Sequence, residues 1–157
     1  MKRIILLVFI SALTLSLTGC SANSSINQTK AGREQAAEIL RCLDADDTEG
    51  LKNMFCEKVA SSHDLDEEIV EAMEFYSGKS VSFSSILVGG GDSMKDGELT
   101  DSHIEYSIKN IQTETGGQYK IATGSYLVYD SNPSYEGIIY LKIIDENTDT
   151  RIEIGGI

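Results

Sequence analysis

The sequence predicts an α+β fold in which three N-terminal helices pack on one face of a curved antiparallel sheet. Two observations support this prediction. Between residues 31 and 78 the apolar residues recur at the three-to-four-residue spacing of amphipathic helices, whereas after Gly78 they alternate with polar residues, as in half-buried strands. A run of helices followed by a run of strands is typical of domains whose helices are segregated on one side of an antiparallel sheet.

The chain opens with a short cationic and then apolar segment. Two basic residues precede an apolar run from Ile4 to Leu17, which is too short to span a bilayer comfortably and is typical of a secretory signal peptide. The motif Leu-Thr-Gly-Cys at residues 17–20 resembles the lipobox of bacterial lipoproteins. The resemblance implies that residues 1–19 are removed and that Cys20 is acylated, as with palmitate. We therefore expect a lipid-anchored protein at the cell membrane, facing outside the cytoplasm.

The chain is strongly acidic, with a formal net charge of −12 at pH 7. Such a charge repels phosphate backbones, so we expect no nucleic-acid partner. It also repels anionic lipid headgroups, so the acyl group at Cys20, rather than a basic patch, must hold the protein at the membrane. The two histidines and the cysteines lack the spacing of a zinc site, and we expect no cofactor and no metal.

The part of the chain that follows the signal peptide divides into a tether and one domain. Residues 20–30 are mostly polar and are expected to form a flexible tether. Residues 31–157 are long enough for a single α+β domain. Cys42 and Cys56 fall on the first and second predicted helices. An exported protein permits a disulfide between them, and the alternative is two small packing residues.

The three helices are expected in the following order. The first carries an apolar stripe at positions 36, 39, 40 and 43 and breaks at an aspartate-rich segment. Asp46 or Asp47 is expected to cap the second helix, which carries apolar residues at 51, 54, 55 and 59. Asp64, with a glutamate three residues later, is expected to cap the third, and Gly78 stands where a left-handed C-cap belongs.

The strands are expected after Gly78. A first strand is predicted near residues 80–85, followed by a mobile glycine-rich linker at residues 89–97. A hairpin follows, in which a two-residue Gly-Gly turn pairs Thr115 with Gln118 and places Tyr106 opposite Leu127.

The last strands are expected on either side of a tight turn. Residues 138–144 are apolar on both faces and predict a central strand, one face of which a homodimer or another partner would have to cover. Residues 145–149 carry oxygens at the alternate spacing of a calcium loop, but the glycine and the distal glutamate of such a loop are missing. A solvated hairpin turn is the better interpretation.

The same hairpin register defines a candidate pocket. Tyr106, Thr123 and Ser125 share the sheet face that the helices are expected to cover, and two of the three are small polar residues at the middle of a strand. The alternative is a packed core with satisfied hydroxyl groups. Asp101 and His103 are a possible acid–base pair, but they have the opposite parity to Tyr106 and are expected to point away from it, which argues against catalysis.

Three helices followed by a curved, meandering sheet resemble the cystatin-like cone of the nuclear-transport-factor superfamily. Local segments are also similar to an uncharacterised family of Gram-positive lipoproteins, a domain of unknown function with this type of fold; they include residues 37–43, 51–56, 121–133, 136–138 and 154–156. The resemblance covers most of residues 31–157 and transfers no catalytic residues.

Three functions follow as hypotheses. The first is a non-catalytic binding domain for a small molecule, a peptide or a protein, of unknown ligand. The second is a small enzyme of the isomerase or hydro-lyase type that uses the cone pocket. The third is a dimerisation or scaffold module. The superfamily contains all of these kinds of protein, so the fold alone does not choose between them.

Overall fold

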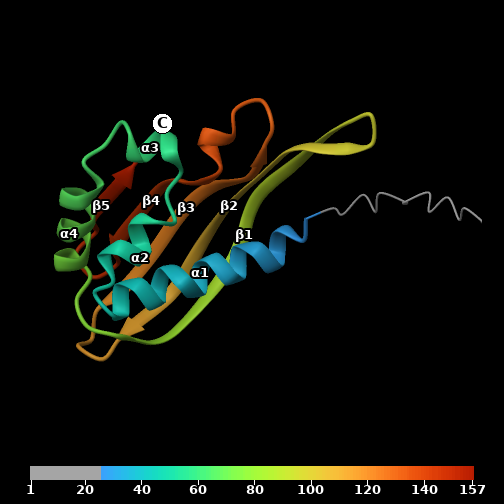
Figure 1. The fold of residues 1–157 in the computed structure, drawn as a ribbon. Helices are drawn as coiled ribbons and strands as arrows, with labels where there is room; N and C mark the ends of the chain where they lie inside the picture. Colours follow the sequence, from blue (N-terminus) through green and yellow to red (C-terminus); the bar gives the residue numbers. More distant parts are fainter. Residues whose placement is uncertain (1–25) are drawn as a thin grey trace, which may run out of the picture.

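The computed structural model describes residues 26–157 and confirms the α+β class (Figure 1). The predicted signal peptide, Cys20 and the first part of the tether lie outside the described residues. The helices precede the strands, as predicted, and the elements are α1 (Gln28–Asp44), α2 (Thr48–Lys52), α3 (Glu57–Ala60), α4 (Leu65–Phe75), β1 (Ser80–Lys95), β2 (Glu98–Thr113), β3 (Gln118–Tyr129), the 3-10 helix η1 (Pro133–Tyr135), β4 (Gly137–Asp145) and β5 (Thr150–Gly155).

The interval expected to hold the second helix holds two short ones, α2 and α3. Between them the chain leaves the helix to pair with β4: the Cys56 amide donates to the Ile138 carbonyl at 3.0 Å, and the Ile138 amide donates to the Met54 carbonyl at 2.9 Å. Phe55 thus forms a parallel bridge with Ile138. Helical periodicity at positions 51–59 does not reveal this long-range pairing, because a buried bridge and a buried helix turn need the same apolar residues.

The starts of α2 and α4 are fixed by polar caps that the sequence predicts. Asp47 accepts a hydrogen bond from the Gly50 amide at 2.9 Å, and Asp64 accepts one from the Glu67 amide at 3.3 Å. The first helix begins at Gln28, inside the segment expected to be tether, because Asn27 caps it by accepting from the Lys30 amide at 2.9 Å. Each cap satisfies an amide that has no partner within its helix.

The sheet is a meander in the order β1-β2-β3-β4-β5, with every neighbouring pair antiparallel. The predicted mobile linker at residues 89–97 is wrong, because β1 continues through the three glycines to Lys95. The turn lies instead at Asp96 and Gly97, with φ of 54° and 87°, between the paired residues Lys95 and Glu98. Asp-Gly with two positive φ angles suits the tight turn that matches strand twist.

The predicted register of the β2–β3 hairpin is also wrong, by four residues. Tyr106 pairs with Thr123 rather than Leu127, and the loop spans residues 114–117 rather than two glycines. Thr113 closes this longer loop, since its carbonyl accepts from the Gly116 amide and its hydroxyl from the Gly117 amide, both at 3.0 Å. Because four is an even number, each side chain still faces the predicted side of the sheet.

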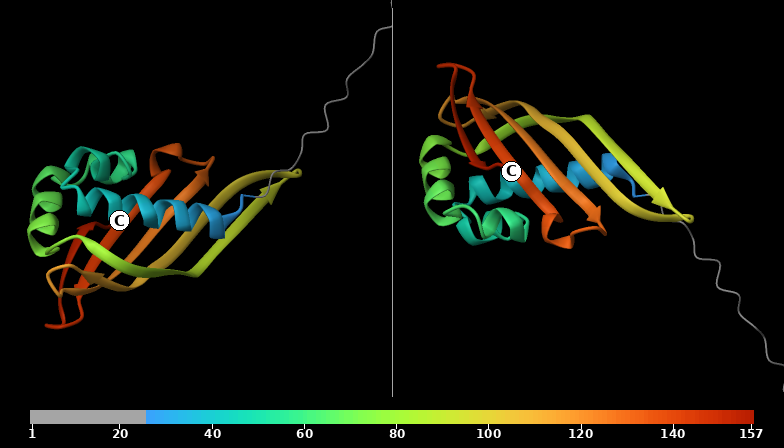
Figure 2. Two further views of the ribbon diagram at one scale, coloured as in Figure 1. Left: turned by 90° about the horizontal axis from the view of Figure 1, so that it is seen from below. Right: turned by 90° about the horizontal axis from the view of Figure 1, so that it is seen from above.

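The helices cover one face of the sheet, and the core lies between the two layers (Figure 2). One row of this core crosses four strands through directly paired isoleucines, which we call the isoleucine row: Ile108, Ile121, Ile143 and Ile152. The first three are fully buried and Ile152 is partly buried. Within residues 26–157 no helix is long and apolar enough to cross a membrane.

β4 was predicted to be buried on both faces, and the structure buries its helix-facing side chains more fully than those on the outer face. Ile138, Leu141 and Ile143 are fully buried toward the helices, whereas Ile139 and Ile144 are only half-buried. Lys142, on the outer face, forms an ion pair with Glu153 at 3.0 Å. Polar and half-exposed side chains therefore line the face that was expected to need a partner, and the homodimer stays a prediction.

Candidate functional site

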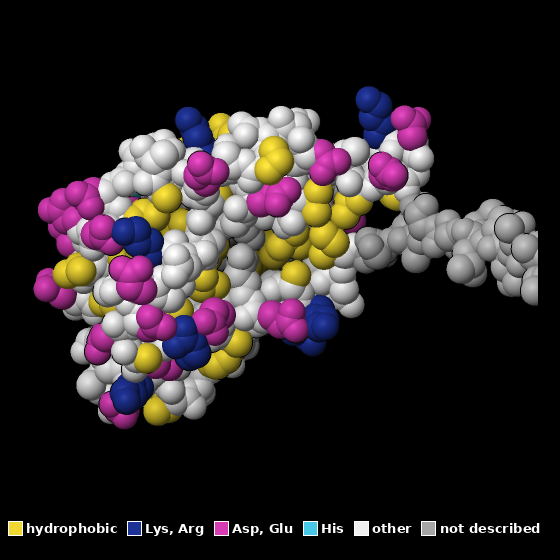
Figure 3. Space-filling view, viewed as in Figure 1, with side chains coloured by type: hydrophobic (Ala, Val, Ile, Leu, Met, Phe, Trp, Pro, Cys, Tyr) yellow, Lys and Arg dark blue, Asp and Glu magenta, His cyan; other side chains and the backbone are white. Residues whose placement is uncertain are grey.

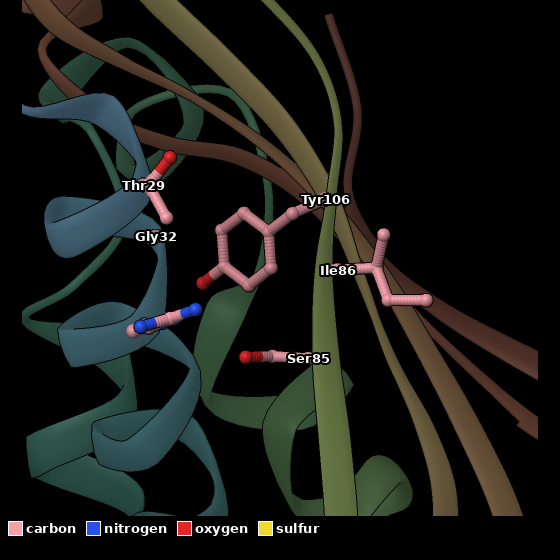
Figure 4. Close-up of a pocket in the computed structure, with 6 residues that line it drawn as sticks. Thr29, Gly32, Ser85, Ile86 and Tyr106 are labelled. Atoms are coloured by element: carbon pink, nitrogen blue, oxygen red, sulfur yellow. The ribbon is translucent and has the colours of Figure 1, made fainter.

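A cavity of about 220 Å³ lies between α1 and the first two strands, and it includes one predicted pocket residue, Tyr106. The six lining residues come from the helix (Thr29, Gly32, Arg33) and from the strands (Ser85, Ile86, Tyr106). Figure 4 shows Tyr106 and Ser85 directed toward α1, with the Ile86 side chain pointing away. Hydrophobic side chains gather on the surface between α1 and the β1–β2 hairpin (Figure 3).

Small residues let α1 approach the sheet closely at this cavity. Gly32 is buried, and a methyl group there would meet the Tyr106 and Ile104 side chains at 3.6 and 3.7 Å. At the helix start, the Gln28 amide group donates to the Asp92 carboxylate at 2.8 Å. A side chain at Gly90 would meet Gln28 at 2.6 Å, so the glycine in β1 leaves room for this contact. These contacts hold the start of α1 beside β1 and β2 next to the cavity.

Two predicted pocket residues are joined by a side chain that sequence reasoning missed. The Tyr106 and Ser125 hydroxyls both donate to the Gln35 side-chain oxygen, at 3.2 and 2.9 Å. Thr123 donates to the Tyr140 carbonyl at 2.8 Å. We call Gln35, Tyr106, Thr123 and Ser125 the hydroxyl seam. A polar residue on a helix looks like a surface position in sequence, so nothing in the pattern distinguished Gln35.

The hydroxyl seam marks where the cavity ends. Tyr106 lines the cavity with its ring, whereas Thr123 and Ser125 do not line it and are almost fully buried. Burial raises the pKa of Tyr106 above its ordinary value. The phenol therefore stays protonated at neutral pH and serves as a hydrogen-bond donor rather than as a base. Of the three predicted pocket residues, the structure places one at the cavity and two behind it.

Arg33 supplies the positive charge of the cavity. Its side chain is exposed, and within residues 26–157 no carboxylate lies within ion-pair distance of it. Lys30, one turn earlier, differs because it pairs with Glu34 at 3.7 Å. The residues lining the cavity thus comprise a guanidinium group, hydroxyl groups and an aromatic ring, and none of them is acidic.

The possible acid–base pair lies on the other face of the sheet, in agreement with its parity. His103 Nδ1 is 3.4 Å from the Asp101 carboxylate, and the imidazole is about half exposed. Ile104, the next residue, is fully buried toward the helices. Asp101 and His103 are therefore not brought together with Tyr106.

Cys42 and Cys56 are buried and free. Cys42 lies beside Arg41, whose guanidinium is 3.2 Å from its sulfur, and burial raises the pKa of the Cys42 thiol. Cys56 lies at the start of α3. In the structure Cys42 and Cys56 are therefore two packing residues that no disulfide joins.

No group of three or more His, Cys, Asp or Glu side chains within the described part of the chain is arranged to hold a metal ion. The residues 145–149 form the hairpin turn between β4 and β5.

A second hollow, of about 370 Å³, was not anticipated from the sequence. We call it the tyrosine hollow, and it is lined by Tyr126, Tyr129, Ser131, Asn132, Tyr135, Ile139 and Ile157. It shares no lining residue with the cavity at Tyr106. Tyr126 and Tyr129 both lie on β3, where their rings stack, and the return of the chain through η1 brings the ring of Tyr135 to them.

Comparison with known proteins places this chain in a family without an assigned role. The model of a domain of unknown function, DUF5104, matches residues 38–146, which is more than half of the chain, so the chain belongs to this family. A search among curated proteins found no match. The matched range includes Tyr106, Thr123 and Ser125, whereas Arg33 and Gln35 precede it.

Proposed function

We propose that this member of the DUF5104 family is a non-catalytic binding protein, held at the outer face of the cell membrane by a lipid on Cys20. The anchor rests on the lipobox resemblance at residues 17–20. The helices over one face of a meandering sheet support a relationship to the cystatin-like cone.

The observation that carries the binding role is Arg33 beside the ring of Tyr106. A guanidinium group that has no ion-pair partner among residues 26–157 is suited to a carboxylate, which it binds through two parallel hydrogen bonds. The aromatic ring offers an apolar surface next to that charge. The cavity volume of about 220 Å³ is below the roughly 300–1,000 Å³ of typical drug-sized pockets. A small, flat carboxylate is the class of ligand that fits.

The enzyme alternative has less support. An isomerase or hydro-lyase of this kind needs a base within hydrogen-bond reach of its substrate. The Asp101–His103 pair lies on the opposite face of the sheet, and the pKa of Tyr106 is raised by burial. The cavity thus offers positioning and charge rather than a group that accepts a proton at neutral pH.

A pair of probes tests the carboxylate site. Benzoate and benzamide have the same ring and nearly the same size, but only benzoate is charged. In saturation-transfer NMR we expect benzoate to bind the wild-type protein more strongly than benzamide does. Arg33→Gln should abolish that preference. Lys30→Gln, which removes one positive charge from the same helix, should retain it. Equal benzoate binding by Arg33→Gln and the wild type would contradict the proposal.

The lipid anchor has its own test. Mass spectrometry of the membrane-extracted protein should find a diacylated or triacylated cysteine, Cys20, at the N-terminus. Cys20→Ala should leave an unprocessed precursor or a mislocalised protein. A cleaved, unmodified N-terminus at another residue would refute the anchor without affecting the carboxylate site.

A further inference from the structure

The tyrosine hollow lies where the end of β3 meets η1 and β4. Two of its tyrosines come from β3 and the third, Tyr135, comes from η1. The 3-10 helix packs beside α3 at the edge of the molecule (Figure 1). The other residues that line the tyrosine hollow are the aliphatic Ile139 and Ile157 and the polar Ser131 and Asn132. Aromatic, aliphatic and hydroxyl groups thus border one space.

The three rings form a corner. Tyr126 and Tyr129 are stacked, with centroids 4.7 Å apart and planes 26° apart. Tyr135 stands nearly perpendicular to both, at 84° to Tyr126 and 81° to Tyr129. All three rings are half-buried, so each keeps part of its surface open to a ligand. Rings that support one another in this way are held before any ligand arrives.

The backbone around the hollow is also fixed. The Tyr129 amide donates to the Glu136 carboxylate at 2.9 Å, and the Asn132 amide donates to the Tyr129 carbonyl at 2.9 Å. The Ser134 hydroxyl donates to the Asn132 side-chain oxygen at 2.7 Å. These bonds tie the 3-10 turn to the end of β3. The aromatic corner is therefore presented by a strand and a fixed turn, as an organised binding site requires.

The charges around the hollow limit the class of ligand. No lining side chain is charged. Just outside the lining, Asp101 and Glu136 supply negative charge: burial and then the Asp101 carboxylate raise the pKa of Tyr126, and Glu136 holds the Tyr129 amide. The Tyr126 phenol is therefore a neutral donor and acceptor at neutral pH, and the two carboxylates repel an anionic ligand.

From this combination we propose that the tyrosine hollow is a binding site for an uncharged saccharide, in addition to the cavity at Tyr106. The apolar C–H face of a pyranose ring lies flat on an aromatic ring, while its hydroxyls bond to phenol, hydroxyl and amide groups such as those of Ser131 and Asn132. The volume of about 370 Å³ suits one or two sugar rings rather than a long polymer, because it is near the lower limit of small-ligand pockets.

The ring spacing argues against a quaternary ammonium ligand. An aromatic cage holds such a cation among several ring faces that lie within about 6 Å of it. Tyr126 and Tyr129 use their facing surfaces for each other, at a spacing that leaves no room for an ammonium group. An extended proline-rich peptide also binds aromatic grooves, but it occupies a series of neighbouring pockets, whereas this hollow is a single corner.

The experiment uses neutral sugars of known length. Chitotriose and maltotriose are titrated into the protein and followed by saturation-transfer NMR and calorimetry, with a decaproline peptide and benzoate as comparison ligands. We expect at least one of the two sugars to bind, with saturation transferred mainly to its ring C–H protons. Tyr129→Ala and Tyr135→Ala should each weaken binding roughly tenfold or more, the scale expected for removal of an aromatic anchor.

Three variants separate this site from general effects on the fold. Ser131→Leu alters an exposed residue and should block the hollow without removing any core side chain. Tyr140→Ala removes a tyrosine that does not line the hollow and should leave sugar binding unchanged. Arg33→Gln should also leave it unchanged, so failure of the carboxylate proposal stays distinguishable. Absence of binding by both sugars at millimolar concentration, binding that survives Ser131→Leu and Tyr129→Ala, or binding of decaproline alone would overturn the proposal.

Discussion

The isoleucine row and the hydroxyl seam lie next to each other on the same face of β2 and β3, yet they are stabilised in different ways. On β3, Ile121 belongs to the row, and Thr123, two residues later, belongs to the seam. Both are fully buried. Ile121 contributes through apolar burial and packing, whereas Thr123 must first satisfy its hydroxyl, which it does by donating to the Tyr140 carbonyl at 2.8 Å.

The difference shows what each region is for. An isoleucine row that spans four strands fixes the sheet against the helices and leaves no polar group to satisfy. The hydroxyl seam stabilises less per side chain, since a net hydrogen bond contributes only about 0.5–1.5 kcal/mol. The seam instead orients Tyr106, the residue that the cavity shares with the core. The isoleucine row thus stabilises the fold, and the neighbouring hydroxyl seam orients the tyrosine that lines the cavity.

The largest effect is expected in the isoleucine row. Ile121→Ala removes a fully buried side chain from a site between two other isoleucines, and we expect it to cost about 2–5 kcal/mol of unfolding free energy. Urea denaturation measures this. Thr123→Ala on the same strand is the matched variant and should cost less, about 1 kcal/mol for its hydrogen bond and about 0.8 kcal/mol for its buried methyl group. Equal losses in the two variants would remove the distinction between the rows.

Gln35→Leu should have the next largest effect. The substitution keeps the size of the side chain but removes the oxygen that accepts from both Tyr106 and Ser125. Leaving a buried hydroxyl without a partner costs about 1–3 kcal/mol. Adding Ser125→Ala should recover part of that loss, because one unsatisfied hydroxyl disappears. A double variant as unstable as the sum of the two single variants would contradict the network.

Ser125→Leu tests whether there is free space around the side chains of the hydroxyl seam. Ser125 is 1 % exposed and does not line the cavity, so the larger side chain has no free space and should lower stability by about 1–3 kcal/mol. Thermal melting measures the change. An unchanged or raised melting temperature would mean that the space behind Gln35 is open, and Ser125 would then belong to the pocket.

Outside the core, the hydrogen bonds of His63 make a contribution to stability that depends on pH. His63 Nδ1 is 2.9 Å from the Glu68 carboxylate and Nε2 is 3.1 Å from the Gly156 carbonyl. The bond to Glu68, and then the one to Gly156, raise the pKa of His63 above 6.5. Because the folded-state pKa is raised, this stabilisation is fully present below pH 6.5 and is lost as pH rises through the raised value.

NMR titration of the His63 ring protons tests this assignment. The midpoint should lie above 6.5, and Glu68→Gln should lower it. At pH above the midpoint the neutral ring can donate only one of its two hydrogen bonds, so the amides of Gly155 and Gly156 should exchange faster with solvent. An unchanged midpoint in Glu68→Gln would show that Glu68 is not the cause of the shift.

The smallest effect is expected at Ser102, on the same face as Ser125. Its hydroxyl is fully buried and has no hydrogen-bond partner among the described residues. Ser102→Ala therefore removes an unsatisfied group and should change stability by no more than about 0.5 kcal/mol, or raise it. Ser125→Ala, which loses its bond to Gln35, is the matched comparison. A clear loss in Ser102→Ala would imply a partner that the structure lacks.

Which side of the sheet a residue faces was predictable from the sequence, but the exact pairings were not. The two-residue period placed Tyr106, Thr123 and Ser125 on one face, and a register error of four residues did not change that. Local signals at Asp64, and at Asp47 as one of two alternatives, gave the starts of α4 and α2. The start of α1 at Gln28 and the separate helix α3 were not predicted. The Asp96-Gly97 turn was missed because three glycines earlier in the chain gave a stronger loop signal, although β1 continues through them with a register shift between Leu87 and Gly89.

The binding sites were harder to predict because they depend on contacts between distant elements. Gln35 meets Ser125 across 90 positions of sequence, and no local period indicates that contact. Arg33 resembles any charged residue on an exposed helix face until the β1–β2 hairpin is placed beside it. The tyrosines of the second hollow depend on the 3-10 turn, whose short irregular backbone has no periodic signature.

The meander order of the strands has a consequence for how the chain folds. Every strand pairs with its neighbour in sequence, so four hairpins can form one after another with short loop closures. The helices depend on later parts of the chain: Phe55 bridges to Ile138, and Glu68 accepts from the Gly155 amide at 2.7 Å. Docking of α4 therefore waits for β5, whereas α1 packs on the early strands β1 and β2. A chain that ends before β5 keeps its early hairpins and the contacts of α1 but lacks the strand against which α4 packs.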